Sequence, residues 1–169
     1  MFQALYTWIY THRLHDPLSS PVKLSIARSL KSHVVPLSAR LLCKIYVFRD
    51  VRGVPELKNE AIDLLITRMA LTWVGNLGLT QYIYENTPES SILRKLHVDT
   101  FVLTTPFVTL KGQKVHLNLD FVLDVMISLE VPDGKRRLIG REEYVKLDKC
   151  LYHEHSEPGG KPGETTPSS

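Results

Sequence analysis

Residues 38–69 read SARLLCKIYVFRDVRGVPELKNEAIDLLITRM, and the order of caps, apolar positions and helix breakers in this stretch decides the fold. Ser38 can cap a first helix, Gly53 can end it, and Pro55 can open a second helix. Apolar residues repeat at intervals of three and four in both halves, which predicts a helical hairpin. The side chains expected to pack across it are Leu41, Leu42, Ile45, Tyr46 and Phe48 on the first helix and Leu57, Ala61, Leu64 and Leu65 on the second.

Shorter helices are predicted on both sides of the hairpin, each from its apolar spacing and its start signal. They are residues 2–10, residues 81–85 after Thr80, a helix between Thr87 and Pro106, and residues 121–129 after Asn118 or Asp120. The connections are expected to be loops or turns: residues 14–37 with a short helix at 22–30, residues 73–79, residues 108–117 (a plain loop or a short hairpin) and residues 132–134.

The composition is that of an ordinary soluble domain. The chain has 169 residues, of which 43% are hydrophobic and 23% charged, which excludes collagen and a wholly disordered chain. Two cysteines, Cys43 and Cys150, are too few for a disulfide framework, so we expect a reduced, intracellular protein and leave open whether it is nuclear or cytoplasmic. No apolar run approaches the roughly 18 residues of a membrane helix, and no membrane association is expected.

Basic residues outnumber acidic ones in the first third of the chain, although the whole chain carries only a net charge of +3. Such a stretch can neutralise phosphates, so a basic nuclear factor that binds nucleic acid through residues 13–52 is an alternative hypothesis. The charges are spread singly through apolar segments, and no nucleic-acid-binding motif accompanies them. A solvated face is therefore the favoured interpretation.

Three stretches occur in an order that is typical of one known family. They are FQALYTWIYT at residues 2–11, LCKIYVFRD with VPELKNEAID at 42–50 and 54–63, and YIYENTPE with LRKL at 82–89 and 93–96. Together they resemble the C-terminal half of the domain in fungal BTB/POZ proteins and the helical extension that follows it. The resemblance covers roughly residues 2–104. His12 departs from it, because the family usually has glycine there.

The resemblance implies a mainly α fold with little β structure. Residues 1–70 would be the C-terminal helices of a partial BTB/POZ domain, residues 71–155 a helical extension, and residues 156–169 a disordered tail rich in Gly, Pro, Ser and Thr. The paired strands and dimer helices that open the family's fold have no counterpart in this sequence. We therefore expect the chain to be a truncated form of that domain.

The family's members are non-catalytic protein–protein interaction modules, and this function is implied for the chain. Its partner-binding residues would be Phe2, Leu5, Tyr6, Ile9, Leu14 and Asp16. In animal members, a hydrophobic-x-Glu string after this helix engages the cullin scaffold of ubiquitin ligases, and Leu14-His15-Asp16 is the nearest string here. The expected partner is another protein, in a homo- or hetero-oligomer, with a cullin scaffold as one candidate and a substrate-adaptor role as the corresponding function.

No motif predicts catalysis or a cofactor. The sequence holds no nucleophile elbow, phosphate-binding glycine loop or dinucleotide fingerprint, so we expect no enzyme activity and no cofactor. Cys150, His153 and His155 could offer three zinc ligands, whereas a closed structural site needs four. A small zinc protein is thus a weaker alternative, and the favoured interpretation places these residues in a solvated tail.

Overall fold

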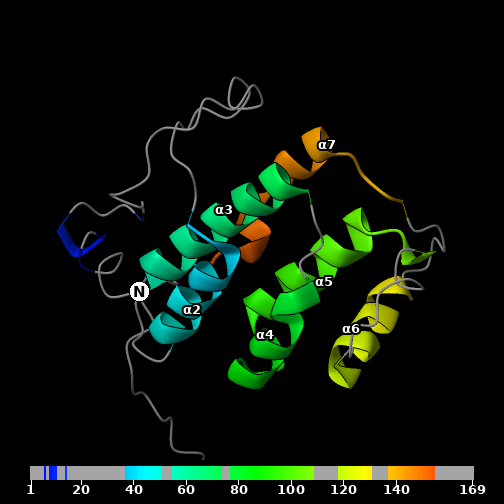
Figure 1. Cartoon of the computed structure of the whole chain (residues 1–169), viewed down its shortest axis with the longest axis horizontal. Coiled ribbons are helices and arrows are strands. Elements are labelled where there is room, and N and C mark those ends of the chain that lie inside the picture. The colour runs from blue at the N-terminus through cyan, green and yellow to red at the C-terminus, as the bar shows by residue number, and fades with distance from the viewer. Residues whose placement is uncertain are drawn as a thin grey trace, which may run out of the picture.

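The computed structural model describes residues 6, 8–10, 14, 37–50, 55–73, 77–108, 118–130 and 137–154. Within these ranges the chain is mainly helical and contains no strand, which agrees with the predicted mainly α fold with little β structure (Figure 1). The elements are α2 (Ala39–Asp50), α3 (Pro55–Thr72), η2 (Leu77–Leu79), α4 (Thr80–Asn86), α5 (Ile92–Thr104), α6 (Leu119–Leu129), α7 (Arg141–Val145) and η4 (Lys149–Tyr152).

Helices α2 and α3 form the predicted hairpin and lie side by side in Figure 1. The Ser38 hydroxyl accepts a hydrogen bond from the Leu41 N–H at 3.3 Å, which caps α2 as expected. Leu42 and Ile45 of α2 are completely buried, and so is Leu57 of α3. The other expected packing residues are buried or partly buried in the same core: Leu41, Tyr46, Phe48, Ala61, Leu64 and Leu65.

A second group of helices, α4, α5 and α6, packs beside the hairpin, with α5 in contact with both α4 and α6. Phe121 of α6 is the centre of this contact. Its ring centroid lies 5.3 Å from that of Phe101, 5.1 Å from that of His97 and 5.9 Å from that of Tyr84. One buried side chain of α6 therefore joins all three helices.

Two predicted helix caps are wrong, and both have a structural reason. Leu79, the residue before α4, already has helical dihedral angles, and the Thr80 hydroxyl bonds His97 instead of the backbone. The Thr87 hydroxyl donates to the Ile83 carbonyl at 2.6 Å and so belongs to the end of α4. Helix α5 begins after Ser91, whose hydroxyl accepts from the Leu93 N–H.

The cap of α6 is confirmed as Asn118, whose side-chain oxygen accepts from the Phe121 N–H at 3.2 Å. Helix α7 and the turn η4 were not predicted. Both pack on α3, so parts of the expected extension contact the expected first domain, whose boundary at residue 70 stays a prediction. Several expectations lie outside the described residues: the short helix at 22–30, the segment 109–117, the turn at 132–134 and the tail at 156–169.

In the described part of the chain, every helix is too short or too polar to cross a lipid bilayer.

Replacing Ile45 with Asp should abolish soluble expression, because the new carboxylate would be unpaired in the completely buried core of the hairpin, at a cost of several kcal/mol. The measurement is the soluble yield, with the helical circular dichroism signal of any soluble protein. Lys44→Asp, at the exposed neighbouring position, is the control and should behave like the wild type. A soluble, helical Ile45→Asp protein would contradict the hairpin.

Candidate protein-interaction surface

Helix α6 carries an exposed apolar face. Leu119 is 70% exposed, Leu123 47%, Met126 58% and Ile127 66%. At about 100° per residue, these four positions fall on one side of the helix. We call these four side chains the α6 surface. Four exposed apolar side chains gathered on one helix face make this surface a candidate interaction site.

The opposite face of α6 holds the helix on the protein. Phe121 and Val125 are buried, and the Phe121 ring lies against rings of α4 and α5. The Tyr84 hydroxyl donates a hydrogen bond of 2.5 Å to the Asp124 carboxylate, and burial together with this carboxylate raises the pKa of Tyr84. Figure 1 shows α6 (yellow) at the edge of the molecule, with α4 and α5 between it and the hairpin. The α6 surface thus faces away from the core.

Buried polar side chains connect α4 and α5 beneath the inner face of α6. His97 of α5 lies against Phe121, and its Nε2 is 2.8 Å from the Thr80 hydroxyl. Burial lowers the pKa of His97 to about 4, so the ring is neutral at pH 7. Arg94 is also buried and donates to the carbonyls of Tyr84 and Thr87, which ties the end of α4 to α5.

The partner-binding residues predicted from the sequence are different ones, near the start of the chain. Of those residues, Tyr6 is 63% and Ile9 55% exposed, while Phe2, Leu5 and Asp16 lie outside the described residues. Leu14 is only 3% exposed and lies in the core, which corrects its expected place on a free surface. A single carboxylate explains this: Glu60 accepts from the Leu14 N–H and from the Trp8 indole, each at 2.6 Å.

The basic stretch at residues 13–52 is described only from Leu37 onward, apart from Leu14. Arg40 and Lys44 are exposed on α2. Arg49 instead packs over two rings, with its guanidinium carbon 5.7 Å from the Trp8 centroid and 5.4 Å from the Phe48 centroid. The nucleic-acid hypothesis stays a prediction.

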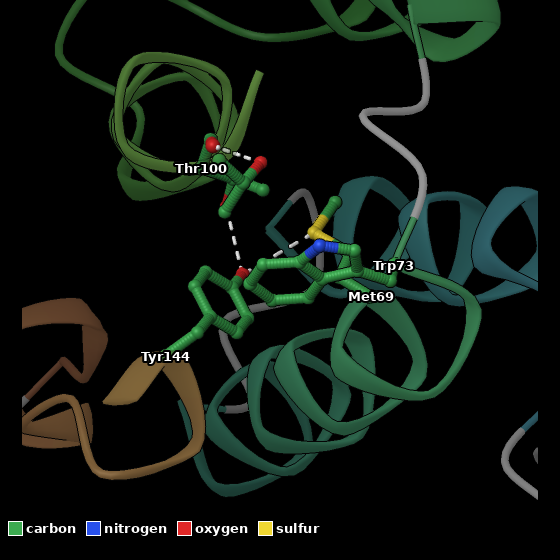
Figure 2. Close-up of a pocket in the computed structure, with 5 residues that line it drawn as sticks. Met69, Trp73, Thr100 and Tyr144 are labelled. Carbon is green, nitrogen blue, oxygen red and sulfur yellow. Dashed lines mark hydrogen bonds between the residues drawn. The ribbon is translucent and has the colours of Figure 1, made fainter. Parts of the chain in front are cut away.

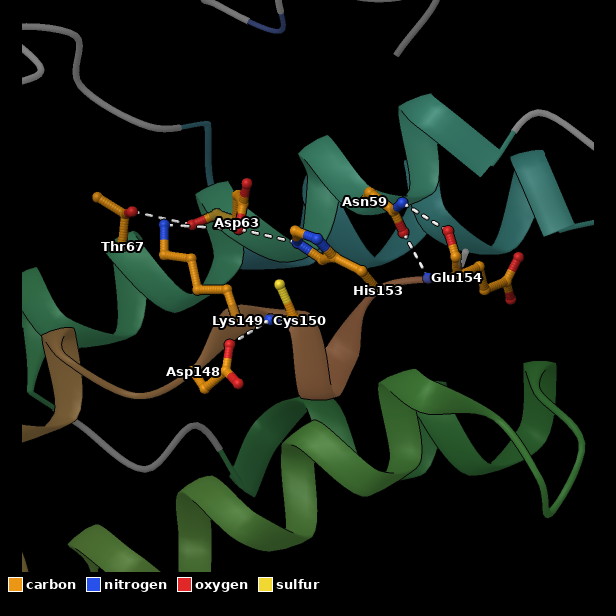
Figure 3. Close-up of polar contacts among 8 residues, drawn as sticks. All are labelled: Asn59, Asp63, Thr67, Asp148, Lys149, Cys150, His153 and Glu154. Atoms are coloured by element: carbon orange, nitrogen blue, oxygen red, sulfur yellow. Dashed lines mark hydrogen bonds and ion pairs between the residues drawn. The ribbon is translucent and has the colours of Figure 1, made fainter. Parts of the chain in front are cut away.

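Residues 149–154 are not a solvated tail, which corrects the sequence-based interpretation of Cys150 and His153. Figure 3 shows the segment lying along α3. His153 Nε2 is 3.1 Å from an Asp63 oxygen, and the side-chain amide of Asn59 makes hydrogen bonds of 2.9 Å to both the N–H and the carbonyl of Glu154. Tyr152 anchors the segment because its ring is buried and its hydroxyl donates to Asp99 at 2.9 Å.

This segment does not assemble the weak zinc site in the part of the chain that the structure describes. Cys150 is exposed, whereas His153 is directed at Asp63, and His155 lies outside the described residues. Among the described residues, no group of three or more His, Cys, Asp or Glu side chains is placed to hold a metal ion. The zinc hypothesis therefore has no support from the geometry.

A small hollow between α3, α5 and α7 offers no room for a substrate (Figure 2). It is too narrow to hold a water molecule. Its lining side chains contact one another: the Tyr144 hydroxyl lies 2.8 Å from the Thr100 hydroxyl and 3.5 Å from the Met69 sulfur, and Trp73 packs edge-on against Tyr144. Trp73 has a φ of 48°, a left-handed conformation that costs a non-glycine residue roughly 1–2 kcal/mol. The hollow is therefore a small gap in the packing where α3, α5 and α7 contact one another.

Cys43 is not placed as an activated nucleophile. Burial raises the pKa of the Cys43 thiol to about 12, which keeps it protonated and unreactive. Cys150 is exposed on η4.

Comparison of the chain with protein-family models, with curated proteins and with solved structures gives no match.

The helix at 121–129 was predicted from Phe121, Val122, Val125 and Leu129, and none of these residues belongs to the α6 surface. A signal for the outer face was present: Leu119, Leu123, Met126 and Ile127 form a second stripe at helical spacing. A surface helix needs only one apolar side to pack on the core, so the second stripe of α6 is left exposed.

Acidification should weaken the support beneath α6. The pKa of His97 is about 4 in the folded chain and near 6.5 when unfolded, so the unfolded state binds the extra proton between these values. We expect full stability above pH 6.5 and a loss of about 3 kcal/mol by pH 4. The measurement is the free energy of unfolding by urea from pH 7 to pH 4.

The variant His97→Gln provides the comparison, because it lacks the titrating imidazole while the carboxylates of the chain titrate as before. The wild type should lose more stability than this variant over the same range. Parallel pH profiles for the two proteins would show that His97 does not titrate as its burial implies.

Proposed function

We propose that the chain is a non-catalytic protein–protein interaction module. The observation that carries this proposal is the α6 surface, four apolar side chains held on a helix whose inner face is fixed to the core. Covering such a side chain contributes roughly 1–2 kcal/mol when about half or more of it is exposed beforehand. Because the helix is already folded and anchored, a partner would not have to order it on binding.

The resemblance of residues 2–104 to fungal BTB/POZ proteins supports the same class of function. A more specific version of this proposal is that the chain is a relative of ubiquitin-ligase substrate adaptors and has a cullin scaffold as its partner. In that form the contact near the start of the chain would fall to Tyr6 and Ile9, which are exposed, because Leu14 is buried. The α6 surface would then be a second contact region, distant in sequence from the first.

Site-specific cross-linking in the source cells tests the proposal. A photoreactive benzoylphenylalanine at position 126, in place of Met126, should give discrete covalent adducts of defined mass on illumination. The same group at Glu142, an exposed position on α7, is the control and should not give these adducts. The double variant Leu123→Ser, Ile127→Ser should reduce adduct yield from position 126 at least tenfold, since it removes half of the apolar face while leaving the inner face intact.

Two results would count against the proposal. One is the same set of adducts from positions 126 and 142, and the other is adduct formation that persists in the double variant. The melting temperature of each purified variant should match the wild type within a few degrees, which separates loss of binding from loss of folding.

A further inference from the structure

One edge of the α6 surface is acidic. Asp120 is exposed and lies next to Ile127 around the helix, since the two differ by seven positions, or about two turns. Asp124 follows on the same edge, half-buried at its contact with Tyr84. Glu130, exposed at the end of the last turn, extends the acidic border beyond Ile127.

The charged side chains of α6 and α4 are all acidic, and Arg94 of α5 lies buried over the Tyr84 ring, with its guanidinium carbon 4.3 Å from the ring centroid. Helix α6 reads LDFVLDVMISL and α4 reads TQYIYEN, and neither contains Lys, Arg or His. The last turn of α6 also lacks a basic residue, so the negative end of its helix dipole adds to the charge of Glu130. On α6 itself, the charged side chains beside and beyond the apolar face are therefore all negative.

This charge pattern discriminates between occupants. Two copies of α6 packed antiparallel about a two-fold axis would bring Asp120 of each close to the C-terminal end of the other, where Glu130 lies. Like charges in that arrangement oppose self-association. An anionic membrane surface is opposed for the same reason, since interfacial helices use Lys and Arg around their apolar face.

Building on the proposed function, we propose that the α6 surface binds an amphipathic helix whose apolar stripe is bordered by Lys or Arg. The four apolar residues span two turns, about 12 Å of helix, which matches a stripe of residues at i, i+3 or i+4, and i+7 in the partner. The partner's basic residues would lie opposite Asp120 and Glu130. The apolar contacts supply affinity, and the charges select the partner.

The direct test uses two designed peptides of 18 residues, each acetylated, amidated and fluorescein-labelled. One has Leu at i, i+3, i+4 and i+7 positions with Lys on both borders, and the other has Glu in place of every Lys. Fluorescence anisotropy with the full chain at low salt should give at least tenfold tighter binding of the Lys peptide. This preference should decrease as salt is added, because the charges are exposed and screened.

Three variants identify the site. Asp120→Lys with Glu130→Lys should reverse the preference, so that the Glu peptide binds more tightly. Glu56→Lys with Glu142→Lys changes the net charge equally, at exposed first-turn positions of α3 and α7, and should leave the preference unchanged. Leu123→Ser with Ile127→Ser should weaken binding of the Lys peptide at least tenfold.

The outcomes separate this inference from the proposed function. Equal binding of both peptides, lost in the Leu123→Ser, Ile127→Ser variant, would overturn the charge preference and leave the interaction module standing. Binding of neither peptide would overturn the inference, and it would leave the module standing only if the cross-links at position 126 persist. A dimer that this variant dissociates, or preferential binding to phosphatidylcholine–phosphatidylserine vesicles, would also overturn it by naming a different occupant.

Discussion

The burial of α3 on several sides is the constraint on which the rest of the structure depends. Helix α2 covers it along the hairpin, α7 reaches Met69 through Tyr144, and the turn η4 packs against it. Both ends of the described chain are fastened to its first turns, since Glu60 holds the backbone of Leu14 and Asn59 holds that of Glu154. The apolar positions of α3 are covered by these neighbours, and the exposed apolar face belongs instead to α6, in the second group of helices.

In that second group, one aromatic ring, Phe121, fixes the position of α6 on α4 and α5. Phe121 sits among Tyr84, His97 and Phe101, so α6 can rotate or leave only if this aromatic cluster is disrupted. The cost of that arrangement is a fully buried histidine, which makes the cluster sensitive to acid. The same arrangement gives α6 a fixed orientation with its other apolar side directed outward, which is the property that an interaction helix needs before a partner arrives.

The sequence was sufficient for the hairpin because local signals and apolar spacing agree there: Ser38 caps α2, and Pro55 opens α3. It was insufficient where a side chain has two possible hydrogen-bond partners. Thr87 could cap a helix after it or bond a carbonyl before it, and only the packing of α4 on α5 selects the second. Likewise, Tyr152 stands in a polar segment that resembles a tail, and its burial depends on Asp99, a residue 53 positions away. The α6 surface could have been recognised from residue spacing, but which of its two stripes faces outward follows only from the position of α5.

If the outer face of α6 is open in the isolated chain and covered by a partner in the cell, methionine oxidation will distinguish the two states. Met126 is 58% exposed on this face and Met69 is 4% exposed in the core, so the two thioethers report the surface and an internal reference in one protein. Hydroxyl-radical footprinting read by mass spectrometry should show Met126 oxidised at least ten times faster than Met69 in the purified chain, and protected several-fold in cells. Equal reactivity of Met126 in the purified chain and in cells would contradict the account.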